Sequence, residues 1–197
     1  MLKVEALARM ADSLRVYDVS QNGWEGDPEG SNPKTPEANL CHVGFHLADV
    51  MARKDFTKLE IVRDEIAPDA MQYGLRIARW GGLSLDQVVP TDKQSSAHKT
   101  AKTLGLYTLS ESYFTLASFV RASGVLARQL HDEDHRSTHE AALAARDHSL
   151  SDAAALLIQC AIVQSNRAQF DLEESFENRL AVLRQRFGIP KPDERSV

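Results

Sequence analysis

Residues 64–80 read DEIAPDAMQYGLRIARW and are the part of the chain that most clearly indicates its fold class. Polar side chains recur there at every third or fourth position: Glu65, Asp69, Gln72, Arg76 and Arg79. Residues at that spacing share one face of a helix, so the segment predicts a helix with a polar stripe. Pro68 clashes with a preceding helical turn and is expected to kink the chain or to begin a new helix. Gly81 and Gly82 are expected to end it.

A second helix with a polar stripe is predicted before this one. Thr35, Pro36 and Glu37 supply an N-cap, a first-turn proline and a first-turn acid, which together indicate a helix start. The helix is expected to run to about residue 53. Its polar face carries residues spaced by four, three and four positions: His42, His46, Asp49 and Arg53. Fifteen residues separate Asp49 from Glu65, enough for the chain to return antiparallel, so the two polar stripes are expected to face each other.

The rest of the chain also favours helices. Only 10 glycines and 7 prolines occur in 197 residues, and Ala, Leu, Arg, Glu and Gln are plentiful. Further helices are predicted near residues 2–17, 108–130, 138–147, 150–166 and 171–187, with a loop over 20–34, a linker over 90–102 and no strand. The expected fold class is all-α: a helical bundle of two weakly repeated halves, residues 1–93 and 94–197, packed as one globular unit.

Charge and missing motifs exclude several classes of protein. Lys and Arg number 23 against 28 Asp and Glu, and the net charge of −5 argues against a nucleic-acid partner. No run approaches the ~18 apolar residues of a membrane span, and the N-terminus lacks a secretory-signal pattern. Cys41 and Cys160 are expected to be buried free thiols in a reducing cytoplasm. No phosphate-loop, Gly-x-Gly-x-x-Gly, Cys-x-x-Cys or Gly-x-Ser-x-Gly motif supports an NTPase, Rossmann, zinc-ribbon or serine-hydrolase assignment.

The two polar stripes carry the residue types of a cation site. Facing carboxylates suit Mg²⁺, which takes carboxylate oxygens and keeps waters that substrate phosphates can replace. An imidazole nearby shifts the preference towards Mn²⁺ or Zn²⁺. The alternative is that both stripes are solvated helix faces with surface ion pairs. A second group of His, Asp and Glu residues lies over 131–152, where a solvated run of charges is the simpler explanation.

Several motifs, taken in their order along the chain, resemble those of one known family. They are Trp24 followed by TPEANL at 35–40, the acidic segment 64–78, GLSLDQV at 82–88, DLEESFENRL at 171–180 and RFG at 186–188. Together they resemble the all-α nucleoside triphosphate pyrophosphohydrolases, which include MazG-like proteins, phosphoribosyl-ATP pyrophosphohydrolase and the dimeric dUTPases. The resemblance covers most of residues 20–90 and 110–188.

The chain departs from the family pattern at the acids themselves. The family signature is Glu-x-x-Glu, a gap, and then Glu-x-x-Asp. Here the first element is His46-x-x-Asp49, and the second is Glu65-x-x-x-Asp69, which is one residue longer. Pro68 is expected to absorb the extra residue. In the second half, Val125 and Arg128 stand where acids would be expected, so that half is predicted to be a scaffold without its own metal centre.

The resemblance implies a function and a set of site residues. The family hydrolyses the α–β phosphoanhydride of a nucleotide to a monophosphate and pyrophosphate, with Mg²⁺ (Mn²⁺ as the alternative) bridging the phosphates and activating a water. Carried over by position, Asp49, Glu65 and Asp69 are the catalytic metal ligands, with His46 a substituted ligand and His42 a further candidate. Phosphate contacts would come from Asn178, Arg179 and Arg186. Trp24 would stack on the base or pack back onto the core.

Three functional hypotheses follow from the sequence. The first is an active, metal-dependent nucleotide pyrophosphohydrolase that acts on the nucleotide pool. The second is a degenerate relative that binds a nucleotide, or only a protein partner, without catalysis. The third is an unrelated helical interaction protein. The nucleotide is the expected partner, and the resemblance leaves both a self-sufficient chain and a homodimer open.

Overall fold

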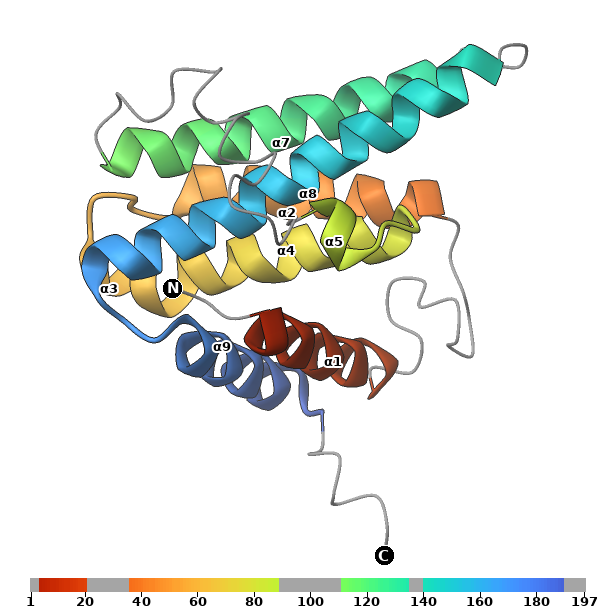
Figure 1. Cartoon of the computed structure of the whole chain (residues 1–197). Coiled ribbons are helices and arrows are strands. Elements are labelled where there is room, and N and C mark those ends of the chain that lie inside the picture. Colours follow the sequence, from red (N-terminus) through yellow and green to blue (C-terminus); the bar gives the residue numbers. More distant parts are fainter. Residues whose placement is uncertain (1–3, 21–35, 89–110, 135–139, 190–197) are drawn as a thin grey trace, which may run out of the picture.

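The computed structural model describes residues 4–20, 36–88, 111–134 and 140–189, and all regular structure within these ranges is helical (Figure 1). Six long helices form a packed bundle: α1 (Val4–Ser20), α2 (Pro36–Arg53), α4 (Ala67–Trp80), α7 (Glu111–Asp134), α8 (Glu140–Ala168) and α9 (Leu172–Phe187). Short elements complete it: α3 (Leu59–Ile61), the π-helix η2 (Val62–Ile66) and α5 (Leu85–Val88). The all-α prediction is confirmed.

The local signals in the sequence mark several helix ends correctly. Helix α4 begins at Ala67, directly before Pro68, whose fixed φ and missing N–H are tolerated in the first turn of a helix. It ends before Gly81 and Gly82, and Gly82 adopts a left-handed φ of 67°. Helix α9 is capped by the side chain of Asp171, which accepts from the N–H of Glu174 at 3.1 Å. These positions agree with the predicted helices.

One predicted break in the second half is wrong. The sequence indicates separate helices near 138–147 and 150–166, but α8 is a single helix over Glu140–Ala168. Residues 147–150 contain neither proline nor glycine, so nothing interrupts the backbone hydrogen bonds there. The prediction of buried cysteines is confirmed for Cys160 and wrong for Cys41, which is exposed on α2. The loop over 20–34 and the linker over 90–102 lie almost wholly outside the described residues, and Trp24 does too.

Helix α4 runs through the middle of the bundle. It packs against α8 and α2 on one side and against α9 and α1 on the other (Figure 1). Every residue of α4 except Arg79 is buried. Its polar stripe is therefore not a solvated helix face, because Asp69, Gln72 and Arg76 are each at most 3% exposed. Burial of these side chains makes α4 the element around which a site can form.

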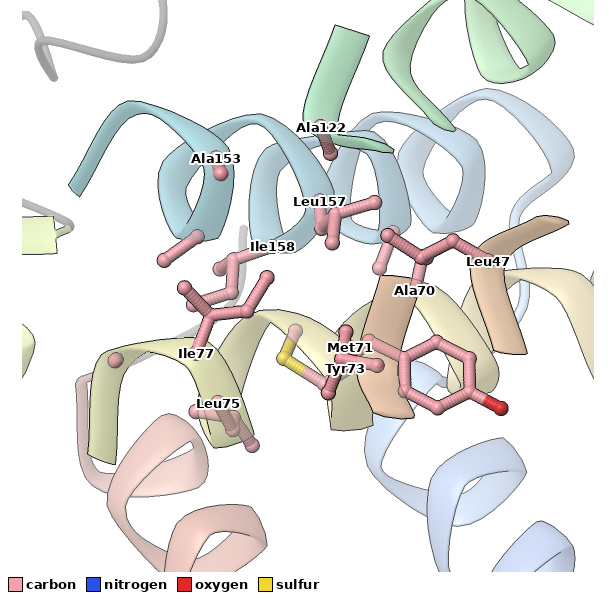
Figure 2. Packing of buried hydrophobic residues seen from close by; sticks show 14 of the residues in the cluster. Leu47, Ala70, Met71, Tyr73, Leu75, Ile77, Ala122, Ala153, Leu157 and Ile158 are labelled. Carbon is pink, nitrogen blue, oxygen red and sulfur yellow. The ribbon is translucent and has the colours of Figure 1, made fainter. Parts of the chain in front are cut away.

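The hydrophobic core joins both halves of the sequence. Figure 2 shows Met71 and Ile77 of α4 facing Leu157 and Ile158 of α8, with Ala122 of α7 beyond them. These residues belong to one continuous cluster that also includes residues of α1, α2 and α9. The chain thus packs as one bundle, while its internal duplication stays a prediction. None of the helices in the described ranges is long and apolar enough to cross a lipid bilayer.

Gly74 allows the closest approach between α4 and α8. A Cβ atom at this position would lie 2.7 Å from Cγ1 of Ile158 and 3.0 Å from the carbonyl oxygen of Ala154. Such distances are below van der Waals contact, so any larger residue must push the two helices apart. Small residues at 153–155 on α8 complete the close contact.

We predict that Gly74→Ala lowers the free energy of unfolding by about 1–3 kcal/mol, the usual cost of overpacking a core. Gly124→Ala on α7 is the matched control, because a Cβ there meets nothing within 4 Å. Replacing this helical glycine by alanine is expected to raise the free energy of unfolding by roughly 0.5–1 kcal/mol. Urea denaturation of both variants measures the difference; equal effects would contradict the proposed contact.

Candidate functional site

A pocket of about 230 Å³ lies where α2, α4 and α9 meet. Five basic side chains line it: Arg53, Lys54, Arg76, Arg179 and Arg186. Its other polar lining residues are His46, Asp49, Asp69, Gln72 and Tyr73, and its apolar wall is formed by Tyr17, Val50, Leu183 and Phe187. The structure therefore brings five sequence-predicted site residues to one pocket: His46, Asp49, Asp69, Arg179 and Arg186.

Asp69 and Arg179, which both line the pocket, form a largely buried ion pair. Nε and Nη2 of Arg179 donate to the two carboxylate oxygens of Asp69 at 2.8 and 2.9 Å, a bidentate arrangement. The Asp69 side chain is only 2% exposed and that of Arg179 is 15% exposed. Nε2 of Gln72 donates to the same carboxylate at 2.7 Å. Burial raises the pKa of the Asp69 carboxyl above its usual value, and the guanidinium of Arg179 opposes that rise.

Glu65 shares the guanidinium of Arg179. Its Oε2 lies 3.7 Å from Nη1 of Arg179 and is also ion-paired with the ammonium of Lys54. Two carboxylates from one turn of the chain, Glu65 and Asp69, thus converge on a single cationic group. Asp49 is held separately, by Nε of Arg53 at 2.6 Å one turn along α2.

Each predicted acidic ligand is therefore paired with a basic side chain. Within the described residues, no three His, Cys, Asp or Glu side chains are placed so that they could hold a metal ion together. The pair Glu65 and Asp69 nonetheless has the chemistry that Mg²⁺ uses, since this ion is often bound by one or two carboxylates with waters and substrate phosphates as its other ligands. The metal site stays a prediction, and these two carboxylates are the residues best suited to bind Mg²⁺.

A π-helical turn accommodates the extra residue between Glu65 and Asp69. The five residues of η2, Val62–Ile66, have i to i+5 hydrogen bonds, and the N–H of Ala67 donates to the carbonyl of Val62. A π-turn holds one more residue than an α-turn, and such insertions are frequent at functional sites. The extra residue is thus taken up directly before Pro68, and both acids still reach Arg179.

Ser175 completes the hydrogen bonding of this turn. The carbonyl of Arg63 would be the next acceptor in the π-register, but the matching donor position is Pro68, which has no N–H. The hydroxyl of Ser175 on α9 donates to that carbonyl instead. Arg179 follows Ser175 by four residues on the same helix face, so this bond also places Arg179 against the two acids.

Two imidazoles lie beside the acids on α2. The Nε2 atoms of His42 and His46 are 2.5 Å apart, and the ring of His46 stacks on Tyr73 at a centroid distance of 5.8 Å. Burial, with the charges of His42 and Arg76, lowers the pKa of His46 to about 4. His46 is therefore neutral at pH 7 and can accept a hydrogen bond or a cation.

Sequence reasoning missed Asp18 and Lys54. Asp18, at the end of α1, pairs with Nη2 of Arg76 at 2.7 Å, and both side chains are 3% exposed. Nη1 of Arg79 lies 3.5 Å from the same carboxylate. Helix α1 carries two other acids, Glu5 and Asp12, so nothing in the sequence singles out Asp18. Lys54 directly follows Arg53 at the end of a predicted helix, and only the fold places it against Glu65.

The remaining sequence candidates lie elsewhere. Asn178 lines a different pocket, of about 310 Å³, with Arg63, Asp64 and Ser175 among its neighbours. Adjacent positions on a helix point about 100° apart, which separates Asn178 from Arg179. Trp24 lies outside the described residues, as do the side chains of 131–149. Asp152, the last member of that acidic and histidine-rich run, is exposed.

Comparisons with protein-family models, with curated proteins and with solved structures find no match to this chain. The class of protein that the fold defines is an all-α helical bundle with a charged pocket between α2, α4 and α9. The resemblance to the pyrophosphohydrolase family therefore rests on the sequence motifs alone.

We predict that Ser175→Ala lowers the free energy of unfolding by about 0.5–1.5 kcal/mol, because the part-buried hydrogen bond from its hydroxyl to the carbonyl of Arg63 is lost. Ser165→Ala is the matched control, since its hydroxyl donates at 2.9 Å to the carbonyl of Ile162 within the same helix, where a backbone N–H also serves. In a Pro68→Ala chain, which restores a backbone N–H, the cost of Ser175→Ala should shrink. An unchanged cost in the double-mutant cycle would refute the assignment.

We also predict a pH dependence that comes from His46. Its pKa is lowered from 6.5 to about 4 on folding, so the unfolded chain binds more protons between those values. The stability due to neutral His46 is complete above pH 6.5 and is lost as the pH falls towards 4. Since the ring is partly exposed, we expect a loss of about 1 kcal/mol. Urea titrations at pH 7 and pH 5 should show a smaller pH effect for His46→Gln than for the wild type; equal effects would exclude His46 as the source.

Proposed function

We propose that the chain is a nucleotide pyrophosphohydrolase of the MazG-like type, which binds the phosphates of a nucleoside triphosphate in the pocket between α2, α4 and α9. One observation carries the proposal. The pocket is lined by five basic side chains against two acidic ones, in a chain whose net charge is −5. A local excess of arginine in a concave site suits a phosphate-bearing ligand, because guanidinium groups pair with phosphate oxygens in bidentate fashion.

The basic residues divide into two groups by accessibility. Arg53 and Arg186 are exposed at the pocket edge and can meet an incoming phosphate without losing a buried partner. Arg179 and Arg76 lie deeper and are paired with Asp69 and Asp18. We propose that the outer arginines capture the ligand and that the inner ones orient it.

The proposed reaction is hydrolysis of the α–β phosphoanhydride to a monophosphate and pyrophosphate. Glu65 and Asp69 are the residues that would hold Mg²⁺, with Asp49 and the neutral His46 on the facing helix. A divalent cation held by these residues would supply charge stabilisation for the phosphates and a water of lowered pKa. Tyr73 and Gln72 line the same pocket and would help to exclude bulk water.

A second candidate function is nucleotide binding without hydrolysis. It is favoured by the ion pairs of Asp49, Glu65 and Asp69 with Arg53, Lys54 and Arg179, because each pair competes with a metal for the carboxylate. The two candidates share the ligand and differ in turnover, so one set of measurements separates them.

The test combines a binding assay with a product assay. Purified protein is mixed with a panel of standard and damaged nucleoside triphosphates, with Mg²⁺ or Mn²⁺, and its melting temperature and pyrophosphate release are measured. A ligand that binds only the folded state raises the melting temperature. Nucleotide-dependent stabilisation with pyrophosphate release supports hydrolysis. Stabilisation without release supports the second candidate, and no response to any nucleotide excludes both.

We predict that Arg186→Gln weakens nucleotide affinity by roughly tenfold, because one charge-assisted hydrogen bond to a phosphate is lost. Its melting temperature without ligand should stay close to that of the wild type, since the side chain is exposed. Arg9→Gln is the matched control, an exposed arginine on α1 that pairs with Glu173 and does not line the pocket. Equal affinities of the two variants would place the phosphates elsewhere.

A further inference from the structure

We infer that Arg179 is an exchangeable counter-cation, which holds Glu65 and Asp69 in the ligand-free protein and moves to the ligand phosphates when they bind, so that nucleotide and divalent cation bind cooperatively. The inference rests on the proposed function and concerns the regulation of the same pocket. A divalent cation that binds without nucleotide is expected to bind weakly, because Arg179 already pairs with its carboxylate ligands.

The geometry places Arg179 between two carboxylates and the pocket. Its guanidinium makes two hydrogen bonds to Asp69, at 2.8 and 2.9 Å, and lies 3.7 Å from Glu65. It also lines the pocket and is 15% exposed, so an incoming phosphate can reach it. The guanidinium of Arg179 therefore pairs with the carboxylates that a divalent cation would use as ligands. It is also a hydrogen-bond donor that a phosphate could use.

Charge balance makes the two bound states alternatives. In the ligand-free protein, Glu65 and Asp69 are matched by Lys54 and Arg179. A divalent cation that arrives alone meets carboxylates that are already neutralised by two adjacent positive charges. A phosphate that arrives alone is repelled by the same two carboxylates. When both arrive, the basic side chains pair with phosphate and the carboxylates pair with the cation. Each charge then has a partner both with and without ligand. An unpaired buried charge is costly, so the partners can be exchanged only because none is left unpaired.

The neighbouring residues allow this movement without unfolding a helix. Arg179 is anchored on α9 one turn after Ser175, so only its side chain has to turn. Arg186 lies two turns further along α9 and lines the same pocket, as does Arg53 on α2. A phosphate held by these outer arginines would draw the guanidinium of Arg179 away from Asp69 by Coulombic attraction.

Cooperativity of this kind is reciprocal: if nucleotide raises the affinity for the cation, the cation raises the affinity for nucleotide by the same factor. Removal of Arg179 should therefore have opposite effects on the two ligands. The affinity for the cation alone should rise because the acids are released, and the affinity for nucleotide should fall because a phosphate donor is lost. A residue with a merely structural role would weaken both.

The experiment is isothermal titration calorimetry of the full chain with Mn²⁺ alone and with a hydrolysis-resistant α,β-imido nucleoside triphosphate, in the presence and absence of Mn²⁺. We expect Arg179→Gln to bind Mn²⁺ alone roughly 5- to 150-fold more tightly than the wild type, the range typical of coupled sites. Mn²⁺ should also raise the melting temperature of Arg179→Gln more than that of the wild type. Arg9→Gln should behave as the wild type does.

Each outcome decides the inference. Tighter Mn²⁺ binding by Arg179→Gln together with weaker nucleotide binding supports it, and nucleotide binding as tight as that of the wild type overturns it. Unchanged or weaker Mn²⁺ binding overturns it, even if the wild type binds nucleotide and the proposed function stands. If the wild type binds no nucleotide, the proposed function fails by itself. Should Arg179→Gln fail to fold, Lys54→Gln serves as the second variant. It releases Glu65 from an ion pair whose side chains are 29% and 30% exposed, and the same opposite changes in affinity are expected.

Discussion

The structure depends on one constraint: helix α4 is buried on every side and carries charges that must be paired. An isolated buried charge costs several kcal/mol, and removing one partner of a buried pair leaves that cost uncompensated. Asp69 and Arg76 meet this requirement with partners from opposite ends of the chain, Arg179 of α9 and Asp18 of α1. The two helices that cover the lower side of α4 in Figure 1 are thus the two that supply its counter-charges.

Helix α4 contributes to both the hydrophobic core and the pocket. The face of α4 that meets α8 is apolar and closely packed, with Gly74 against Ile158 and no room for a Cβ. The polar residues Asp69, Gln72 and Arg76 of α4 line the pocket that lies where α2, α4 and α9 meet. Rigid packing on one side holds the charged side in place, so the carboxylates and guanidinium groups of the pocket keep their mutual geometry in the absence of ligand.

An irregularity in the backbone joins these two faces. The π-turn Val62–Ile66 holds one residue more than an α-turn, and Pro68 leaves the carbonyl of Arg63 without a helical donor. Because Ser175 supplies that donor, the insertion also fixes the register of α9 against α4. The unpaired carbonyl, which would destabilise an isolated helix, thus forms a hydrogen bond between two helices. Ser175 lies one turn before Arg179, which pairs with Asp69.

The sequence by itself determined the helical class, the start and end of α4, the extent of α2, and the residues that could occupy a polar stripe. These features depend on local rules, namely proline and glycine at helix ends, capping side chains and a spacing of three or four residues. It also named five candidate site residues that the structure places in one pocket, His46, Asp49, Asp69, Arg179 and Arg186. It did not indicate which basic side chains pair with the acids.

Only the tertiary structure decided that the stripe of α4 is buried, that Arg179 and Lys54 neutralise Asp69 and Glu65, and that Asp18 pairs with Arg76. These pairs join residues up to 110 positions apart, and the Coulombic and hydrogen-bond energies that select them arise only when packing excludes water and brings distant helices together.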